Sequence, residues 1–550
     1  MEKINKTKIF IIKPSRYLKY YILPFIAFSM IGLSAQNAKP APPEAPSAAN
    51  KKYTFLDGLE FEGQIRFRPE LRENTDFNKT TDDKKDYTGQ KVQFGMTKTF
   101  NQNIKAKILF QDARVWGGEK GAEHGANTAV SGQTTDIREA WVEYKTSDGF
   151  SAQAGRQTLV YGDQRLLGAL EWSTTGRSFD GIRLKYESDM FKSHVFGMVL
   201  GEKDSDVGLN VTNAKLQDAY LTGWYNTLKL NEHFQAEGYY FGKYQRFIPK
   251  TNPVSVAPGA LITTQDRDVQ RDLLHTFGAR LTNRTTDKGK STTEFDWTTE
   301  YIVQRGTNGK YVNASWDTAQ VIMPIDPFLF NSTNNPCRTS MTKGGCRVYT
   351  EKQQYDTHAF AAKAGYTLMK KIRIGGEYNV GSGDPNRTDS TVGTFQNLFG
   401  TNHAHYGQSD TVSFSNMIGR SADITLFFEK YGSIVFAVWD FRKNKLQDAW
   451  YNVNGVANAA QSTESASNNK YKDSAFLQAA IAREFDVTYN VDFGNLNWNV
   501  GYSTTIAGKS ITNSMDDIAY NYFVLKKPGV TQYKADPRYD FLYVMMTYKF

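Results

Sequence analysis

The last twelve residues of the chain, Tyr539 to Phe550, constrain its fold more than any other stretch. They read YDFLYVMMTYKF and run to the C-terminus. Counting back in steps of two gives an unbroken apolar series, Phe550, Tyr548, Met546, Val544 and Leu542. A period of two is the repeat of a β-strand with one apolar face. Such a strand could close a larger sheet. The alternative is an ordinary edge strand of a sheet in a soluble protein.

The N-terminus predicts export from the cytoplasm. Six Lys or Arg residues precede an apolar run from Tyr20 to Leu33, which Ser34 and Ala35 follow. The run is too short for a transmembrane helix and its flanks are typical of a secretory signal peptide, so we expect residues 1–35 to be removed. Residues 36–57 are rich in Pro and Ala and predict an extended periplasmic leader. Residues 58–550 contain no linker and form the remaining domain.

The charge balance does not point to nucleic acid as a partner. The full chain has a formal net charge of +9, but the signal peptide accounts for much of it, and 60 basic against 56 acidic residues remain. Beyond the signal, no continuous apolar run approaches the length of a transmembrane helix. A mean hydropathy of −0.54 is nevertheless compatible with membrane strands that alternate lipid-facing and lumen-facing residues.

Alternation of this kind recurs from Leu59 onward. Leu59, Phe61, Ile65 and Phe67 alternate with polar or charged residues, and we count about 18 such segments. The connections between these segments alternate between short turns and long polar loops. An open strand edge in lipid leaves backbone groups without hydrogen-bond partners, so the strands must close on themselves. The sequence therefore predicts an all-β fold, a single closed antiparallel transmembrane β-barrel of the bacterial outer membrane, with short periplasmic turns and long extracellular loops.

Two cysteines, Cys337 and Cys346, lie close together in one polar loop. In an exported protein such a pair most simply forms a disulfide that closes a short ring. Two thiols without histidine partners make a poor zinc site, and we expect no metal there.

Two segments carry a resemblance to a known family. The first contains GRQ from Gly155, YGDQRL from Tyr161 and RSFDGIRL from Arg177, and the second runs from Gly381 to Asp410. Together they resemble the alginate-export family of outer-membrane barrels, and the C-terminal strand resembles the signal that the barrel assembly machinery reads. The resemblance implies an 18-stranded channel whose lumen narrows at a cluster of arginines that pass an anionic polysaccharide.

The candidate substrate-binding residues lie in two places. Five are in or beside the third long loop, residues 162–175, and three are on inward strand faces: Arg156, Asp163, Arg165, Arg177 and Asp180, then Arg66, Arg68 and Arg183. Guanidinium groups stay charged and grip carboxylates with two hydrogen bonds. Arg156 shares its phase with outward residues, and a bulge at Gly155 would turn it inward. A surface loop with solvated charges is an equal alternative, and acidic residues on the inward faces weaken purely anionic selectivity.

These observations favour a monomeric channel that passes a polar, anionic saccharide by passive diffusion. The loop residues His403, His405, Asp410, Asp384 and Asp389 have no spacing that supports catalysis, so we expect neither an enzyme nor a cofactor. The expected partners are outer-membrane lipid, the assembly machinery, and anionic saccharides or small solutes. A general small-solute porin is the first alternative. A surface adhesin that uses loops 307–352 and 446–474 is the second.

Overall fold

A computed structural model describes residues 57–80, 82–116, 135–201, 216–247, 254–255, 261–262, 270–286, 291–317, 346–386, 389–457, 478–512 and 534–550. Residues Gly58–Phe550 form one compact unit. The predicted signal peptide, the leader up to residue 56, and Cys337 of the predicted disulfide lie outside the described residues. Those expectations therefore remain predictions.

Eighteen strands form the wall of the protein. They are β1 (Leu59–Glu73), β2 (Lys85–Thr99), β3 (Ile104–Val115), β4 (Thr135–Lys145), β5 (Phe150–Gln157), β6 (Phe179–Glu187), β7 (Phe191–Gly201), β8 (Leu216–Asn231), β9 (Phe234–Phe247), β12 (Gln270–Thr282), β13 (Phe295–Asp317), β14 (Cys346–Leu368), β15 (Ile372–Gly381), β17 (Met417–Phe428), β18 (Gly432–Lys443), β19 (Ala480–Phe493), β20 (Leu496–Ala507) and β21 (Arg538–Lys549). The minor elements are β10 (Val254–Ser255), β11 (Leu261–Ile262), β16 (Thr391–Val392), and the 3-10 turns η3 (Asn402–Ala404) and η4 (Glu429–Tyr431).

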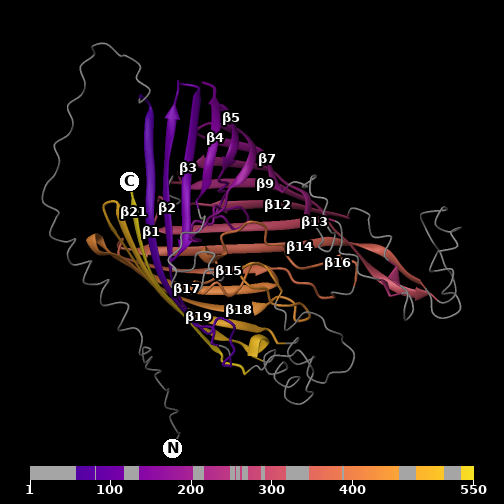
Figure 1. The fold of residues 1–550 in the computed structure, drawn as a ribbon. Coiled ribbons are helices and arrows are strands. Elements are labelled where there is room, and N and C mark those ends of the chain that lie inside the picture. Colours follow the sequence, from indigo (N-terminus) through magenta and orange to yellow (C-terminus); the bar gives the residue numbers. More distant parts are fainter. Residues whose placement is uncertain are drawn as a thin grey trace, which may run out of the picture. The chain divides into compact units, whose positions relative to one another are not determined.

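The wall is a closed antiparallel barrel. Each strand pairs with the next along the chain, and β1 pairs with both β2 and β21, so that Arg66 lies opposite Lys91 on one side and Thr547 on the other. Figure 1 shows β1 and β21 side by side. The backbone of Gly63 exchanges two hydrogen bonds with that of Phe550, at 2.8 and 3.1 Å. The predicted closure by the C-terminal strand and the predicted strand number are both confirmed.

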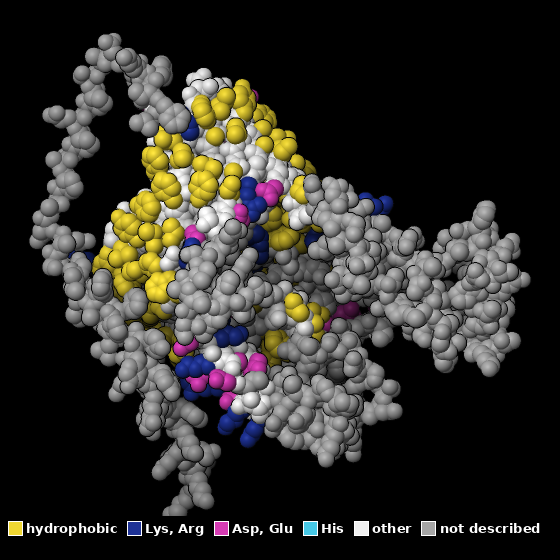
Figure 2. All heavy atoms as spheres, viewed as in Figure 1, with side chains coloured by type: hydrophobic (Ala, Val, Ile, Leu, Met, Phe, Trp, Pro, Cys, Tyr) yellow, Lys and Arg dark blue, Asp and Glu magenta, His cyan; other side chains and the backbone are white. Residues whose placement is uncertain are grey.

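The two faces of the wall have opposite character. Large apolar side chains such as Phe61, Phe94, Phe150 and Leu184 are exposed on the outside, whereas polar residues such as Gln153 are buried inside. Figure 2 shows hydrophobic side chains gathered over the outer face of the barrel. This pattern is the inverse of a soluble protein and suits a lipid-facing surface. In the part of the chain that is described, no helix is both long and apolar enough to cross a membrane.

Two extracellular connections fold into the barrel instead of projecting from it. We call residues 158–178, between β5 and β6, the first inner loop, and residues 382–416, between β15 and β17, the second inner loop. Four of their apolar side chains, Leu159, Leu167, Phe395 and Phe414, are at most 1% exposed and pack against the inner wall. The hydrophobic core therefore lies inside the lumen.

Candidate functional site

The first inner loop enters the lumen because the wall is low where the loop begins. β5 has 8 residues and β6 has 9, against 15 in β1 and 12 in β3. Gln164 and Leu170 then take positive φ angles of 62° and 53°, which turn the chain sharply without glycine. The loop thus crosses the barrel below its extracellular rim.

The two inner loops are joined through their backbones. Gly168 donates to the Phe399 carbonyl at 3.0 Å, Phe399 donates to the Leu166 carbonyl at 2.8 Å, and Thr401 donates to the Gln164 carbonyl at 2.9 Å. Leu167 and Phe399 form a parallel bridge at this point. The close approach requires Gly400, where a Cβ atom would lie 2.2 Å from the Arg165 carbonyl oxygen. The loops therefore form one plug with a shared hydrogen-bond ladder.

Basic residues of β1 hold one side of this plug. Arg66 donates to the carbonyl oxygens of Glu171 and Ser173 at 2.7 and 2.9 Å, and Arg68 donates to that of Trp172 at 2.5 Å. Both arginines are buried, at 6% and 5% exposure. Both guanidinium groups therefore hold the loop by hydrogen bonds to its backbone carbonyl oxygens.

Arg165 fixes the opposite side of the plug to β13 and β15. Its guanidinium forms a close ion pair with Glu377, lies 3.8 Å from the Glu300 carboxylate, and donates to Asn379 at 3.1 Å. Burial alone would lower the pKa of Arg165, but Glu377 and the other nearby acids hold it well above its ordinary value. The arginine is therefore charged, and its guanidinium group contacts residues of the barrel wall.

Asp163 forms a second junction two residues away. Arg280 of β12 donates to it at 2.5 Å, and Lys363 of β14 makes a close ion pair. Burial alone would raise the pKa of Asp163, yet Lys363 and Arg280 keep it well below its ordinary range.

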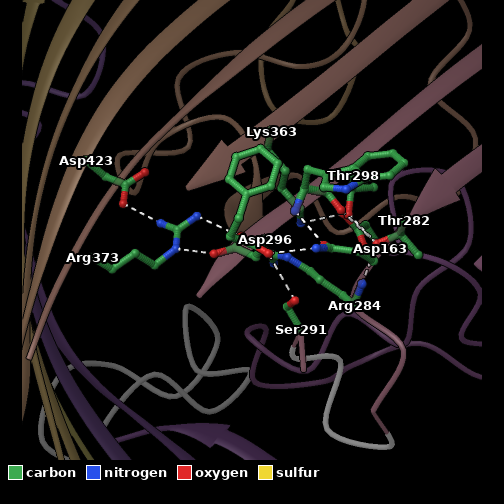
Figure 3. A network of polar contacts seen from close by, with 12 residues as sticks. Asp163, Thr282, Arg284, Ser291, Asp296, Thr298, Lys363, Arg373 and Asp423 are labelled. Atoms are coloured by element: carbon green, nitrogen blue, oxygen red, sulfur yellow. Dashed lines mark hydrogen bonds and ion pairs between the residues drawn. The ribbon is translucent and has the colours of Figure 1, made fainter. Parts of the chain in front are cut away.

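The charges continue along the wall beyond this junction. Figure 3 shows Asp296 held between Arg284 and Arg373, with Asp423 on the far side of Arg373. Opposite charges alternate through this network, so the inner wall on this side presents little net charge.

Histidines of the second inner loop complete the plug. The His405 Nε2 atom lies 2.6 Å from the Asp163 carbonyl oxygen, and burial, reinforced by Arg165, lowers the pKa of His405 to about 3. His403 stacks on Trp172 of the first loop at 3.7 Å between ring centroids and contacts Asp410 at 2.9 Å. Within the described ranges, no group of His, Cys, Asp and Glu side chains is arranged to hold a metal ion.

Arg177 ties the end of the first loop to the second. It donates to the carbonyl oxygens of Gly168 and Gly400, at 3.3 and 3.4 Å, and closely to that of Phe399. Burial and the neighbouring Arg138 lower the pKa of Arg177 to about 10. Its role in the structure is to join the loops.

A cavity of about 310 Å³ lies on the periplasmic side of the first inner loop. Its lining includes three cations, two carboxylates and two stacked tyrosines: Lys192, Arg280, Arg284, Asp163, Glu237, Tyr161 and Tyr225. The tyrosine rings are 4.6 Å apart, and the Tyr161 hydroxyl lies 3.2 Å from His194. Arg183, half-buried on the inner face of β6, bonds to Gln153 at 2.8 Å near this cavity.

The model of the alginate-export family matches residues 57–524, which is most of the chain. The protein belongs to the alginate-export family. With its closed barrel and apolar outer face, it is a bacterial outer-membrane channel, as the resemblance implied. No curated protein matches the sequence.

Several solved barrels from Pseudomonas aeruginosa are similar to this alginate-export barrel. OccK11 (OpdR) and OpdO are each 11% identical with a TM-score of 0.47, and the matches cover 90% of this chain and 96% and 97% of theirs. The outer-membrane protein OprD is 10% identical with a TM-score of 0.47, covering 90% of this chain and 93% of its own.

Arg156 and Asp180 lie apart from the other candidates of this alginate-export barrel. The bulge at Gly155 that would turn Arg156 inward does not form, because β5 pairs with β4 and with β6 along these described strands without a register shift. Arg156 therefore keeps the outward phase of Ala154 and binds Asp180 at 2.8 Å on the outside of the rim. The question that alternation left open for Arg156 is thus answered by its strand pairing, which keeps it out of the lumen.

Arg280, Lys363 and Lys192 were missed by the reasoning from sequence. All three stand on inward phases of their strands, so alternation could have identified their face. Alternation could not show that β12 and β14 lie against the first inner loop, because Asp163 is 117 residues from Arg280. Only the closed topology brings them together.

Proposed function

We propose that this barrel passes an anionic saccharide by passive diffusion, with the cavity below the first inner loop as its binding step. The cavity supports this proposal because three cations face two carboxylates around it, and Lys192 is exposed at its edge. Its volume is at the lower end of small-molecule sites, which run from about 300 to 1,000 Å³. Ammonium and guanidinium groups bind carboxylates through charge-assisted hydrogen bonds.

The candidate residues divide into two roles under this proposal. Lys192 and Arg183 contact the saccharide, since both stand on the inner wall beside the cavity and keep part of their surface exposed. Arg66, Arg68, Arg165, Arg177 and Asp163 position the plug and shape the opening without needing to touch the saccharide.

Block of the channel by uronates tests the proposal. In planar bilayers containing the purified barrel, a short polyuronate added on the periplasmic side should reduce the current, and Lys192→Glu should weaken block about tenfold, the equivalent of one lost charge contact. Lys430→Glu, in the exposed turn Glu429–Tyr431, is the matched control and should leave block unchanged. Equal block of wild type by an uncharged glucan of the same length would contradict anion recognition.

A general small-solute porin is the second candidate, and the size of the cavity favours it. About 310 Å³ suits a single sugar residue more closely than a polymer. Liposome swelling separates the two, because a porin would admit monomeric uronate and neutral sugars at similar rates. The adhesin alternative rests on loops that lie mainly outside the described residues.

A further inference from the structure

A row of charged residues crosses the outside of the barrel from β17 to β21. The strand register aligns Arg420 with Asp440, Asp440 with Arg483, Arg483 with Ile506, and Ile506 with Arg538. Arg442 stands two residues beyond Asp440 on β18. Arg442, Arg483 and Arg538 have side chains 45%, 69% and 46% exposed. Their strand neighbours Phe441, Glu484 and Tyr539 are buried, so the row faces outward.

This row marks the extracellular border of the apolar band. On the periplasmic side of it, the outward positions are apolar, as at Val438, Phe436, Phe485 and Val487. Along β21, Arg538 is ten residues from Tyr548 of the C-terminal aromatic end, about 33 Å of strand at 3.3 Å per residue. A strand tilt of about 40° reduces this to about 25 Å, the height of the apolar band of outer-membrane barrels. The row therefore lies at the level of the outer-leaflet headgroups.

The centre of the row has an excess of positive charge. Arg442 and Arg483 approach the two oxygens of Asp440 at 2.7 and 3.2 Å, and Arg420 stands directly across from Asp440 on β17. Two guanidinium groups thus contact one carboxylate, and the third, on the neighbouring strand, lies 5.8 Å from the centroid of the Tyr378 ring. Further along, Arg538 has its own partner, Asp540, at 2.8 Å, and Glu73 of β1 is aligned with Asp540.

Arg305 and Arg156, two other arginines of the rim, do not share this excess. Arg305 on β13 binds Asp356 of β14 at 2.7 Å. Arg156 lies between Asp136 and Asp180, at 3.6 and 2.8 Å. These groups are neutral or acidic, and their carboxylates satisfy the rim arginines without a ligand.

We propose that Arg420, Arg442 and Arg483 form a binding site for the phosphate of a phosphorylated lipid headgroup in the outer leaflet. A phosphate monoester carries about −1.5 to −2 charges at neutral pH and three acceptor oxygens, which matches three guanidinium groups less one carboxylate. Arginine is the side chain best suited to grip phosphate, because its planar fork donates two parallel hydrogen bonds. The apolar surface directly below accommodates the acyl chains of the same lipid.

The amount of lipid that the whole purified protein retains tests this site. Native mass spectrometry of the barrel in detergent with bisphosphorylated lipid A should show bound lipid, and the variant Arg442→Gln/Arg483→Gln should retain it at least about tenfold less well, as expected for a lost charge-assisted contact. Arg305→Gln is the matched control and should bind like wild type. Heat-modifiable migration confirms that each variant is folded.

Two further measurements decide between a phosphate site and a structural role. Asp440→Asn removes the carboxylate that Arg442 and Arg483 contact and should strengthen retention of the phosphorylated lipid, whereas a purely structural cluster would lose it. Lipid A without phosphate should bind as weakly to wild type as to the double variant. Unchanged retention in the double variant, or equal retention of the dephosphorylated lipid, would overturn the proposal. Saturation by inorganic phosphate alone, without lipid, would overturn its assignment to a lipid.

Discussion

Most of the charged side chains around the inner loops are engaged by one another or by the loop backbone. Arg165, the clearest case, is 3% exposed and lies between Glu377 and Glu300, whose side chains are 12% and 6% exposed. A buried ion pair contributes little net stability relative to apolar packing, but the loss of one partner leaves an uncompensated charge. Each such residue therefore matters more to the position of the plug than to the charge seen by a solute.

Arg165→Gln tests this view of the buried arginine. The substitution leaves Glu377 and Glu300 without their cation, so it should lower the free energy of unfolding by about 3–5 kcal/mol. Urea unfolding in lipid vesicles, followed by tryptophan fluorescence, measures the change. Arg156→Gln removes an exposed ion pair and should cost less than about 1 kcal/mol. Equal losses for the two variants would show that Arg165 does not hold the plug.

His405 makes docking of the loops depend on pH. Its pKa is about 3 in the folded protein against 6.5 for a free histidine, so the undocked state binds the extra proton. Docking is therefore fully stable above about pH 6.5 and weakens as the pH falls towards 3. At pH 5 the loss is about 2 kcal/mol. The charged groups that face His405 are Arg165, Glu377, Lys363 and Asp163. The raised pKa of Arg165 and the lowered pKa of Asp163 keep these two loop residues charged at that pH.

Current noise at pH 7.5 and pH 5 should reveal the effect. Wild type should show larger and more frequent current fluctuations at pH 5, and His405→Asn should remove most of that difference. A variant that keeps the full pH dependence would exclude His405 as its source. The lowered pKa of Asp163 also makes docking less stable as the pH falls, but only below about pH 4, where a free carboxyl group begins to bind a proton.

The two inner loops behave as one element because their backbones share a ladder. Leu166, Gly168 and Thr401 take part in that ladder, and Arg177 spans both loops at its end. Apolar side chains of both loops pack on the same inner wall. A change at the contact between the loops should therefore affect the whole plug.

Gly400→Ala places a methyl group at that contact. The added Cβ would lie 2.2 Å from the Arg165 carbonyl oxygen, a backbone atom that can move only by opening the ladder. Overpacking of this kind costs about 1–3 kcal/mol, so the variant should show higher and noisier conductance. Gly197→Ala is the control, because a Cβ there meets nothing within 4 Å. Identical traces from the two variants would show that the ladder is not needed to keep the plug in place.

The strands could be predicted from sequence, and the contacts of the loops could not. Alternation is local, so the wall from Leu59 to the C-terminus follows from the order of residues, and closure follows from the absence of water in lipid. Arg165 meets Glu377 across 212 residues, and no periodicity relates them. Arg66 and Arg68 were correctly placed on the inner face, but their occupation by loop carbonyls depends on where the loop lies.

At the scale of the whole molecule, the barrel is a rigid wall around a separately fastened plug. The wall is held by backbone pairing that closes at β1 and β21, whereas the plug is held by side-chain ion pairs, a short ladder and apolar packing. This division predicts that the plug can be altered without loss of the barrel. It also predicts that the plug, and not the wall, sets the conductance.

Single-channel conductance before and after removal of the first inner loop tests that prediction most directly. Residues 163–175 would be replaced by a short Gly-Ser linker, and the folded state of the barrel would be checked by heat-modifiable migration. Wild type should give small, discrete current steps that polyuronate blocks, and the variant should give steps severalfold larger that polyuronate no longer blocks. Steps of equal size in the two proteins, or no conductance from either, would contradict a channel whose constriction is this loop.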